Sequence, residues 1–223
     1  GGKDVVACKF NPAFSTLLYS TYIGGPGDDI PSIGGLKIDN LNQATITGRC
    51  GSGFPTTAGS YNQVFAGGTY DVFLAKLNST FNSLVFSTFI GGSGNDAGNN
   101  ICFDENYNSI LTGFSSSGFP TTACAFDETY NGGVSDAFIV KLNNNASTLL
   151  YSTFFGGSGD DKGIGINYSN DTALIYGETS SLNLPTTSNA FDLSYNGGGS
   201  DLFLAKIKLT CENAIANFII PDT

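Results

Sequence analysis

Short apolar runs recur along this chain at an almost constant interval. An Asp, a run of apolar residues and a Lys occupy residues 4–9, 71–76, 136–141 and 201–206. A fixed period of roughly 65 residues is typical of stacked or radially arranged supersecondary units. The sequence therefore predicts a repeat protein, in which the same unit occurs about three and a half times.

Within each repeat, apolar runs of strand length alternate with turns rich in glycine and asparagine. In the second repeat we expect strands over residues 71–77, 84–90, 100–104 and 109–113, because they are rich in β-branched and aromatic residues. No stretch of twelve or more residues shows the apolar spacing of an amphipathic helix. The pattern predicts an all-β protein with almost no helix.

Four short antiparallel strands per repeat are the content of a propeller blade. The third and fourth strands of each repeat are short and carry small residues, which suits an innermost pair near the axis. Each blade would then consist of the third and fourth strands of one repeat followed by the first and second of the next. We expect antiparallel four-stranded β-propeller blades that start and stop in mid-blade.

The expected domain organisation follows from where the repeats end. We assign residues 1–210 to a β-propeller repeat domain and residues 211–223 to a C-terminal extension or the start of a following domain. The repeats are residues 1–66, 67–131, 132–196 and a partial 197–210. A closed propeller needs about four to eight blades. The chain is therefore either a slice of a longer array or a subunit completed by strands from other copies.

Charge and composition narrow the location and the partners. The net charge is −10 and only 13 % of residues are charged, which disfavours nucleic acid and anionic membranes. No apolar run approaches the roughly 20 residues of a transmembrane helix. The acidic surface and the loops rich in Asn, Ser and Thr favour an extracellular or cell-surface protein that is secreted.

Several motifs of the repeat resemble a known family. Residues 136–142 read Asp-Ala-Phe-Ile-Val-Lys-Leu, and residues 149–161 read Leu-Leu-Tyr-Ser-Thr-Phe-Phe-Gly-Gly-Ser-Gly-Asp-Asp. A Phe- or Leu-Pro-Thr-Thr motif occurs at residues 54–57, 119–122 and 184–187. In this order the motifs resemble the SBBP family of β-propeller repeats, over residues 1 to about 209.

The resemblance implies a seven-bladed ring in a large, secreted or surface-attached prokaryotic protein of unknown activity. This chain departs from the family pattern by being too short for such a ring. Residues 211–223 break the repeat and look like the first strand of an immunoglobulin-like module of the PKD type, or like an outer strand of a blade.

Three loops, residues 24–29, 91–96 and 156–161, read Gly-Gly-x-Gly-x-Asp and match the calcium-binding RTX pattern. RTX sites need the motif every nine residues, so a Ca²⁺ site here would be built within one loop, with main-chain carbonyls. The candidate ligands are Asp28, Asp29, Asn95, Asp96, Asp160 and Asp161. The alternative is a glycine turn whose Asp accepts hydrogen bonds from backbone N–H groups. We expect no other cofactor.

Two further charged positions recur with the repeat. Asp71, Asp136 and Asp201 precede the first strand of their units, where we expect each side chain to bind its own turn. The lysines at 9, 76, 141 and 206 lie inside these strands. They either pair with a repeated carboxylate or protect an exposed strand edge from aggregation.

The five cysteines fit no metal-binding spacing, and the chain has no His. Cys50 and Cys124 lie in loops of successive repeats and form a candidate disulfide. We expect Cys8 and Cys102 to be small buried strand residues.

The sequence argues against catalysis. Without His there is no triad and no general base suited to neutral pH. The Asp doublets are neighbours in turns, a poor arrangement for opposing two carboxylates across a glycosidic bond. We therefore expect no enzyme but a structural protein: a subunit of a surface filament, or a rigid module of an adhesion protein, that contacts itself or neighbouring domains of the same chain.

The alternative function is a glycan- or protein-binding propeller module of an adhesin, and a carbohydrate-active enzyme is less favoured. The aromatic series Tyr22, Phe89 and Phe154, and the loop series Phe54, Phe119 and Leu184, could stack on sugars. Periodic aromatic residues more often pack one blade on the next.

Overall fold

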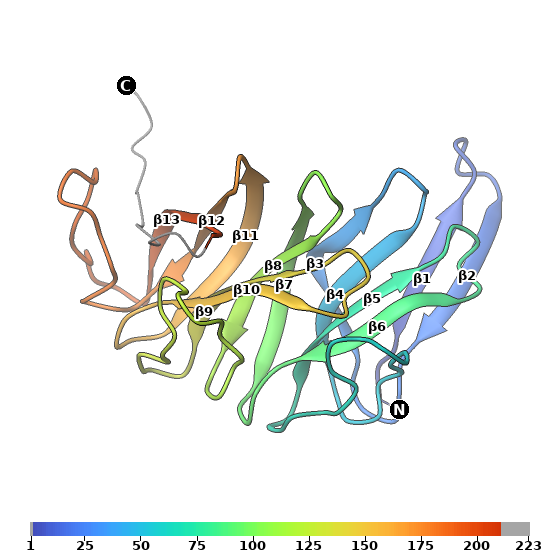
Figure 1. Cartoon of the computed structure of the whole chain (residues 1–223), viewed down its shortest axis with the longest axis horizontal. Helices are drawn as coiled ribbons and strands as arrows, with labels where there is room; N and C mark the ends of the chain where they lie inside the picture. The colour runs from blue at the N-terminus through green and yellow to red at the C-terminus, as the bar shows by residue number, and fades with distance from the viewer. Residues whose placement is uncertain (1, 211–223) are drawn as a thin grey trace.

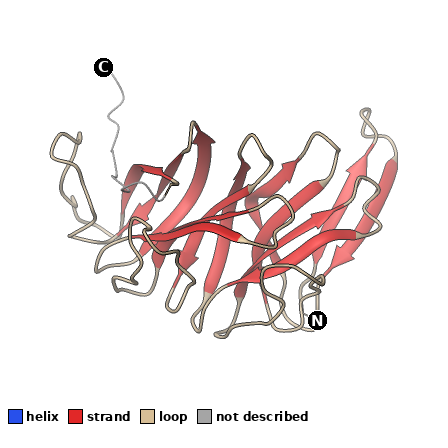
Figure 2. Ribbon diagram, viewed as in Figure 1, coloured by secondary structure: helices blue, strands red, loops and turns tan. Residues whose placement is uncertain are grey.

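The computed structural model describes residues 2–210, which form thirteen strands connected by loops. No helix occurs in this range (Figure 2). The prediction of an all-β protein is confirmed. The expected extension or following domain, residues 211–223, lies outside the described residues.

The strands occur in three hydrogen-bonded sheets, which follow one another from the N-terminal to the C-terminal end of the molecule (Figure 1). One sheet has two strands, the second is a curled sheet of eight, and the third has three. The strands are β1 (Val5–Phe10), β2 (Leu17–Ile23), β3 (Ile30–Ile38), β4 (Ala44–Cys50), β5 (Asp71–Leu77), β6 (Leu84–Ile90), β7 (Asp96–Phe103), β8 (Ser109–Ser115), β9 (Asp136–Leu142), β10 (Leu149–Phe155), β11 (Asp161–Ser169), β12 (Thr172–Thr179) and β13 (Asp201–Lys208).

The eight-stranded sheet consists of two antiparallel halves. Strands β3, β4, β5 and β6 pair in chain order, and so do β7, β8, β9 and β10. We call these the first and second strand groups, and β11–β13 the third. The halves join at one parallel bridge between Gly34 and Asn100. The pairing follows the order expected from the sequence: third and fourth strands of one repeat, then first and second of the next.

The hydrophobic cores lie between the successive groups, on both faces of the first strand of each repeat. Alternate residues of a strand point to opposite faces. In β5, Phe73 and Ala75 belong to one buried cluster, whereas Val72 and Leu74 belong to another that also contains Phe138 of the second group. This explains why residues 72–75 of β5 are continuously apolar and why every residue of the strand is buried.

The third strands of successive repeats approach one another closely. Ser32 Oγ donates a hydrogen bond of 2.6 Å to the carbonyl of Asn99, and Asn99 Nδ2 donates one of 2.8 Å to the carbonyl of Gly163. A Cβ on Gly98 would lie 2.5 Å from Thr47 Oγ1 of the neighbouring group. The small residues that the sequence places in these strands are required by this close packing.

The Pro-Thr-Thr loops run along the outer edge of β6 and β10. Thr57 N donates to the carbonyl of Ser87 at 3.0 Å, and Ser87 N donates to Thr57 Oγ1 at 2.9 Å. Thr122 and Ser152 form the same reciprocal pair, at 3.0 Å in both directions. Each loop thus satisfies the free edge of the last strand in its group.

The cysteines differ from the expectation in two respects. Cys50 is a free and fully buried thiol, so the predicted bridge to Cys124 is not formed. The reason is the register, which places Cys50 opposite Asp71 in the interior of the first group rather than in a loop. Cys102 is buried as expected, but Cys8 is exposed because no strand group covers its side of β1.

Candidate functional site

The recurrent carboxylates align in a row at one end of each strand group. Across β7, β8 and β9 the register places Asp96 opposite Ser115 and Ser115 opposite Asp136. In the third group Asp161, Thr179 and Asp201 align in the same way. An aspartate therefore begins the first and the third strand of these groups, at the same end of the sheet.

Aspartates from neighbouring groups meet over the first glycine of the Gly-Gly loop. A Cβ on Gly91 would lie 2.8 Å from Asp71 Oδ1 and 2.7 Å from Asp96 Oδ2. The backbone holds this arrangement, because Asp96 N donates a 2.9 Å hydrogen bond to the carbonyl of Tyr70. Asp71 belongs to the first group and Asp96 to the second, so the pair spans the junction between them.

The next junction repeats this geometry. A Cβ on Gly156 would lie 2.8 Å from both Asp136 Oδ1 and Asp161 Oδ2, and Asp161 N donates to the carbonyl of Ser135 at 2.7 Å. We call Asp71/Asp96 and Asp136/Asp161 the junction pairs. Only glycine fits between two carboxylates at this distance, which explains why residues 91 and 156 are glycine.

One oxygen of each junction aspartate binds a local loop. Asp71 Oδ2 accepts a hydrogen bond from Ala66 N at 2.7 Å, and Asp96 Oδ2 accepts one from Gly92 N at 2.8 Å. At the second junction the donors are Asn131 N for Asp136 and Gly157 N for Asp161. The expectation that Asp71, Asp136 and Asp201 bind their own turns is confirmed, since Asp201 Oδ2 likewise accepts from Asn196 N at 2.5 Å.

The other oxygen has no such partner. All four residues are 0 % exposed, and the Oδ1 atoms of Asp71, Asp96, Asp136 and Asp161 have no hydrogen-bond partner in the part of the chain that the structure describes. A buried polar atom without a partner is costly, because it has lost its water and gained nothing in return. Four such atoms in two equivalent places indicate a common cause.

Burial changes the acidity of the junction pairs. It raises the pKa of Asp71 and of Asp96 to about 6, and that of Asp136 to about 7. The nearby carboxylate of Asp96 raises the pKa of Asp71 further, and Asp161 does the same to Asp136. The environment therefore resists two full negative charges at each junction.

The structure divides the predicted calcium ligands into two sets. Asp29, Asp96 and Asp161 cap their glycine turns, whereas Asp28, Asn95 and Asp160 accept hydrogen bonds from backbone N–H groups just before the first strand of the same repeat. For example, Asn95 Oδ1 accepts from Thr69 N at 2.6 Å. The six residues do not form three sites within single loops.

The partners that sequence reasoning missed are Asp71 and Asp136. They had been assigned to turns only, although each lies 25 residues before the last aspartate of a Gly-Gly-x-Gly-x-Asp loop. This constant offset between two periodic aspartates was the available signal.

The first loop differs from the other two. Asp29 Oδ2 accepts from Gly25 N at 2.6 Å and its Oδ1 accepts from Gly51 N at 3.2 Å, so both oxygens are satisfied. The equivalent partner, Asp4, is exposed. The N-terminal hairpin β1–β2 therefore carries no buried pair of the junction type.

A second set of polar contacts lies at the opposite end of β7. Lys76 Nζ lies 2.8 Å from Asp39 Oδ2, and Lys141 Nζ lies 2.9 Å from Asp104 Oδ2. All four side chains are largely buried. For Lys76 and Lys141, pairing with a repeated carboxylate is therefore the correct alternative of the two predicted.

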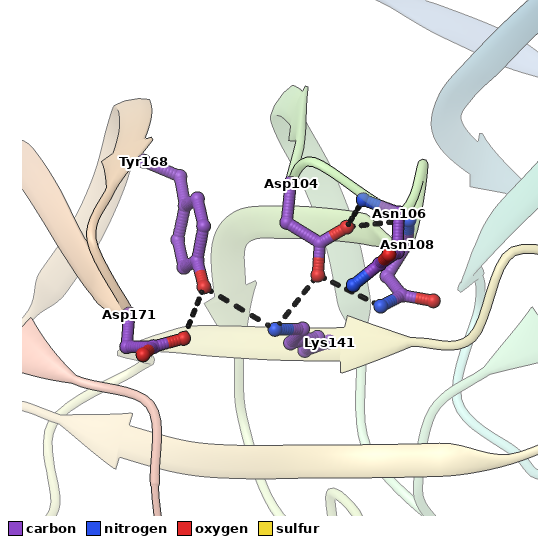
Figure 3. A network of polar contacts seen from close by, with 6 residues as sticks. All are labelled: Asp104, Asn106, Asn108, Lys141, Tyr168 and Asp171. Carbon is purple, nitrogen blue, oxygen red and sulfur yellow. Dashed lines mark hydrogen bonds and ion pairs between the residues drawn. The ribbon is translucent and has the colours of Figure 1, made fainter.

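Figure 3 shows the network around Lys141. Asp104 Oδ1 accepts from the backbone N–H groups of Asn106 and Asn108, at 2.8 and 2.9 Å. Tyr168, from the third strand group, contributes its hydroxyl at 3.5 Å from Lys141 Nζ and donates to Asp171 at 2.9 Å. The network thus connects the second and third groups.

The charges in this network compensate one another. Burial alone would raise the pKa of Asp104, but Lys141 and the hydrogen bonds from Asn106 and Asn108 together hold it below its ordinary value. For Asp39, burial likewise raises the pKa, but Lys76 and backbone hydrogen bonds lower it, and the result is a pKa below its ordinary value. Among residues 2–210, these two ion pairs are the salt bridges that the structure contains.

Most of the periodic aromatic rings are internal. Phe54 packs on Phe73 with ring centroids 4.7 Å apart, and Phe119 packs on Phe138 at 4.4 Å. Phe89 and Phe154 are also buried. Of the proposed sugar-stacking aromatic rings, Tyr22 alone is exposed among the described residues, so the others serve packing.

The two ends of the array have exposed apolar faces. In β2 Tyr19 and Tyr22 are exposed, whereas their counterparts in β6 and β10 are buried. In β13 Leu202 is 81 % exposed. An apolar cavity of about 270 Å³ lies beside it, lined among others by Leu182, Phe191 and Leu204.

The loop at the C-terminal end lacks the strand that the other loops cover. Thr187 is the counterpart of Thr57 and Thr122 in the Pro-Thr-Thr motif. Its Oγ1 is buried and has no partner in the described part of the chain, whereas theirs bind β6 and β10. The third group therefore has three strands within the described range.

The comparisons with known proteins identify no relative. No family model matches the chain, and no curated protein proved similar to it. Within residues 2–210 there is no cluster of three or more His, Cys, Asp or Glu side chains suited to a metal ion. The same range holds no helix that is long and apolar enough to cross a bilayer.

Proposed function

We propose that the chain is a non-catalytic structural module of an extracellular or cell-surface protein, built from propeller-type blades whose ends pack against further repeats. The observation that carries the proposal is the complementarity of the two ends. Among residues 2–210, β2 at the N-terminal end has no covering loop of the kind that β6 and β10 have, and the loop of residues 184–196 at the C-terminal end has no strand to cover.

The sequence of the uncovered strand supports this proposal. β2 reads Leu-Leu-Tyr-Ser-Thr-Tyr-Ile and β10 reads Leu-Leu-Tyr-Ser-Thr-Phe-Phe. Ser20 occupies the position of Ser152, whose backbone forms the reciprocal pair with Thr122. A strand of this type fits beside Thr187, and the repeat of a second copy or of a neighbouring domain of the same chain can supply one.

The exposed surface supports an interface at each end. Contiguous apolar patches rimmed by polar residues mark interaction sites, and an unpaired strand edge is a template for another strand. Leu202 and Phe191 at one end and Tyr22 at the other are each more than three-quarters exposed. The interpretation of the strand groups as propeller blades also rests on the resemblance of the repeats to the SBBP family. The same holds for the proposed location at the cell surface.

Static light scattering of this chain over a concentration series tests the proposal. We expect the average molar mass to rise with protein concentration. Leu202→Asp should abolish this rise, because the new carboxylate places a charge in the apolar end surface. Val134→Asp is the matched control, since Val134 is 71 % exposed in a loop between strands of the array. A constant monomer mass at every concentration would contradict association through the ends.

A further inference from the structure

We propose that each junction pair binds one hard divalent cation, Ca²⁺ in preference to others, between neighbouring strand groups. The observation that supports this proposal is geometric. At each junction two aspartates from different groups surround the same glycine, are 0 % exposed, and each leaves Oδ1 without a partner in the described part of the chain.

The charge at the junctions supports a cation. Two carboxylates at close range inside a protein need a compensating positive charge, because desolvation of an uncompensated ion costs several kcal/mol. Elsewhere the chain supplies this charge itself, with Lys76 for Asp39 and Lys141 for Asp104. No lysine or arginine forms an ion pair with a junction aspartate in the described residues.

The donor atoms select the class of cation. The four unpartnered atoms are carboxylate oxygens, and at the second junction the hydroxyl of Ser135, one residue before Asp136, is also unpartnered. Hard oxygen donors suit Ca²⁺ and Mg²⁺ rather than zinc. Ca²⁺ tolerates irregular geometry, whereas Mg²⁺ retains several waters, which a junction closed to solvent does not accommodate.

The site differs from the one that the glycine motif alone suggests. Its carboxylates come from two strand groups, Asp71 with Asp96 and Asp136 with Asp161, so the cation would hold adjacent groups together. Asp29 has both oxygens satisfied and Asp4 is exposed, so the first loop forms no such site. The expected stoichiometry is two cations for residues 2–210.

The test measures metal content and thermal unfolding of the same 223-residue chain. The protein is loaded with CaCl₂ at pH 7.5, desalted, and analysed for bound calcium by mass spectrometry. We expect two Ca²⁺ per chain. At a free Ca²⁺ concentration of about 100 times Kd, the melting temperature should be about 5–10 °C higher than in EDTA. MgCl₂ at the same concentration should give a smaller shift.

Conservative variants assign the sites. Asp71→Asn and Asp136→Asn keep the shape of the side chain but remove one charge, and each should lose one of the two bound Ca²⁺. Asp192→Asn is the matched control, because Asp192 caps an exposed turn through Ser194 N and lies away from both junction pairs. This variant should keep both cations.

Three results would overturn the proposal. The first is a chain without bound calcium whose melting temperature is the same in Ca²⁺ and in EDTA. The second is a higher melting temperature for Asp71→Asn and Asp136→Asn in both solutions, which would mean that a proton rather than a cation neutralises each pair. The third is loss of calcium from Asp192→Asn alone, which would place the ion on the surface.

Discussion

Lys141 and Asp104 form a buried ion pair of 2.9 Å at the opposite end of β7 from Asp96. The second strand group is therefore connected to its neighbours at both of its ends. At one end Asp96 meets Asp71 of the first group, and at the other Lys141 contacts Tyr168 of the third. This arrangement fixes the orientation of successive groups in addition to the apolar core between them.

The first prediction concerns this ion pair. Lys141→Met should lower the free energy of unfolding by about 3–5 kcal/mol, because Asp104 remains buried without its counterion. Urea denaturation measures the change. In the double variant with Asp104→Asn the loss should be smaller than the sum of the two single losses.

Lys37→Met is the control for the first prediction, because Lys37 is exposed and forms no salt bridge in the described residues. We expect it to change the free energy of unfolding by less than about 0.5 kcal/mol. Additive losses in the double variant would show that Lys141 and Asp104 are not coupled.

The second prediction concerns the core between the groups. Phe138 is 0 % exposed and stacks on Phe119, so Phe138→Ala should cost about 3–5 kcal/mol in the free energy of unfolding. Phe14→Ala should cost far less, since Phe14 is 81 % exposed. Equal losses in urea denaturation would mean that the ring of Phe138 is not internal.

The third prediction concerns the thiols. Burial raises the pKa of Cys102 to about 12 and raises that of Cys50 even further, so both thiols are protonated as well as covered. Cys8 is exposed. Mass spectrometry after alkylation at pH 8 should find Cys8 modified in the native protein. Cys50 and Cys102 should be modified only when the protein is unfolded before alkylation. Labelling of Cys50 in the native state would contradict its position in the core.

The all-β class and several strand bounds were predictable because their signals are local. The strands over residues 71–77 and 84–90 have the expected bounds, since a Gly-Gly or an Asn turn closes each apolar run. The pairing order of the strands also agrees, because the small inner strands identify the crowded side of each group.

The candidate site was less predictable because it depends on contacts between strand groups. Asp71 and Asp96 are 25 residues apart and belong to different groups, so no single loop reveals that they meet. The Cys50–Cys124 prediction failed for the same reason. Both residues follow similar sequence patterns, but the register places Cys50 inside the sheet, opposite Asp71.

The last prediction is a dependence on pH of the cost of Asp104→Asn. The pKa of Asp104 is below its ordinary value of 3.8 in the folded protein. A carboxyl group with a lowered folded pKa contributes stability above the unfolded pKa, and this contribution is lost as pH falls through the folded value. Below that value Asp104 is protonated and resembles Asn.

The difference between wild type and Asp104→Asn isolates this group, because the raised pKa values of the junction aspartates act in both proteins. We expect the variant to be less stable than wild type at pH 6, and the difference in the free energy of unfolding to shrink as pH falls below 3.8 and through the lowered pKa of Asp104. Urea denaturation at several pH values from 6 downward measures it. A difference that stays constant would show that Lys141 does not favour the ionised form of Asp104, and the ion pair would then contribute packing rather than charge.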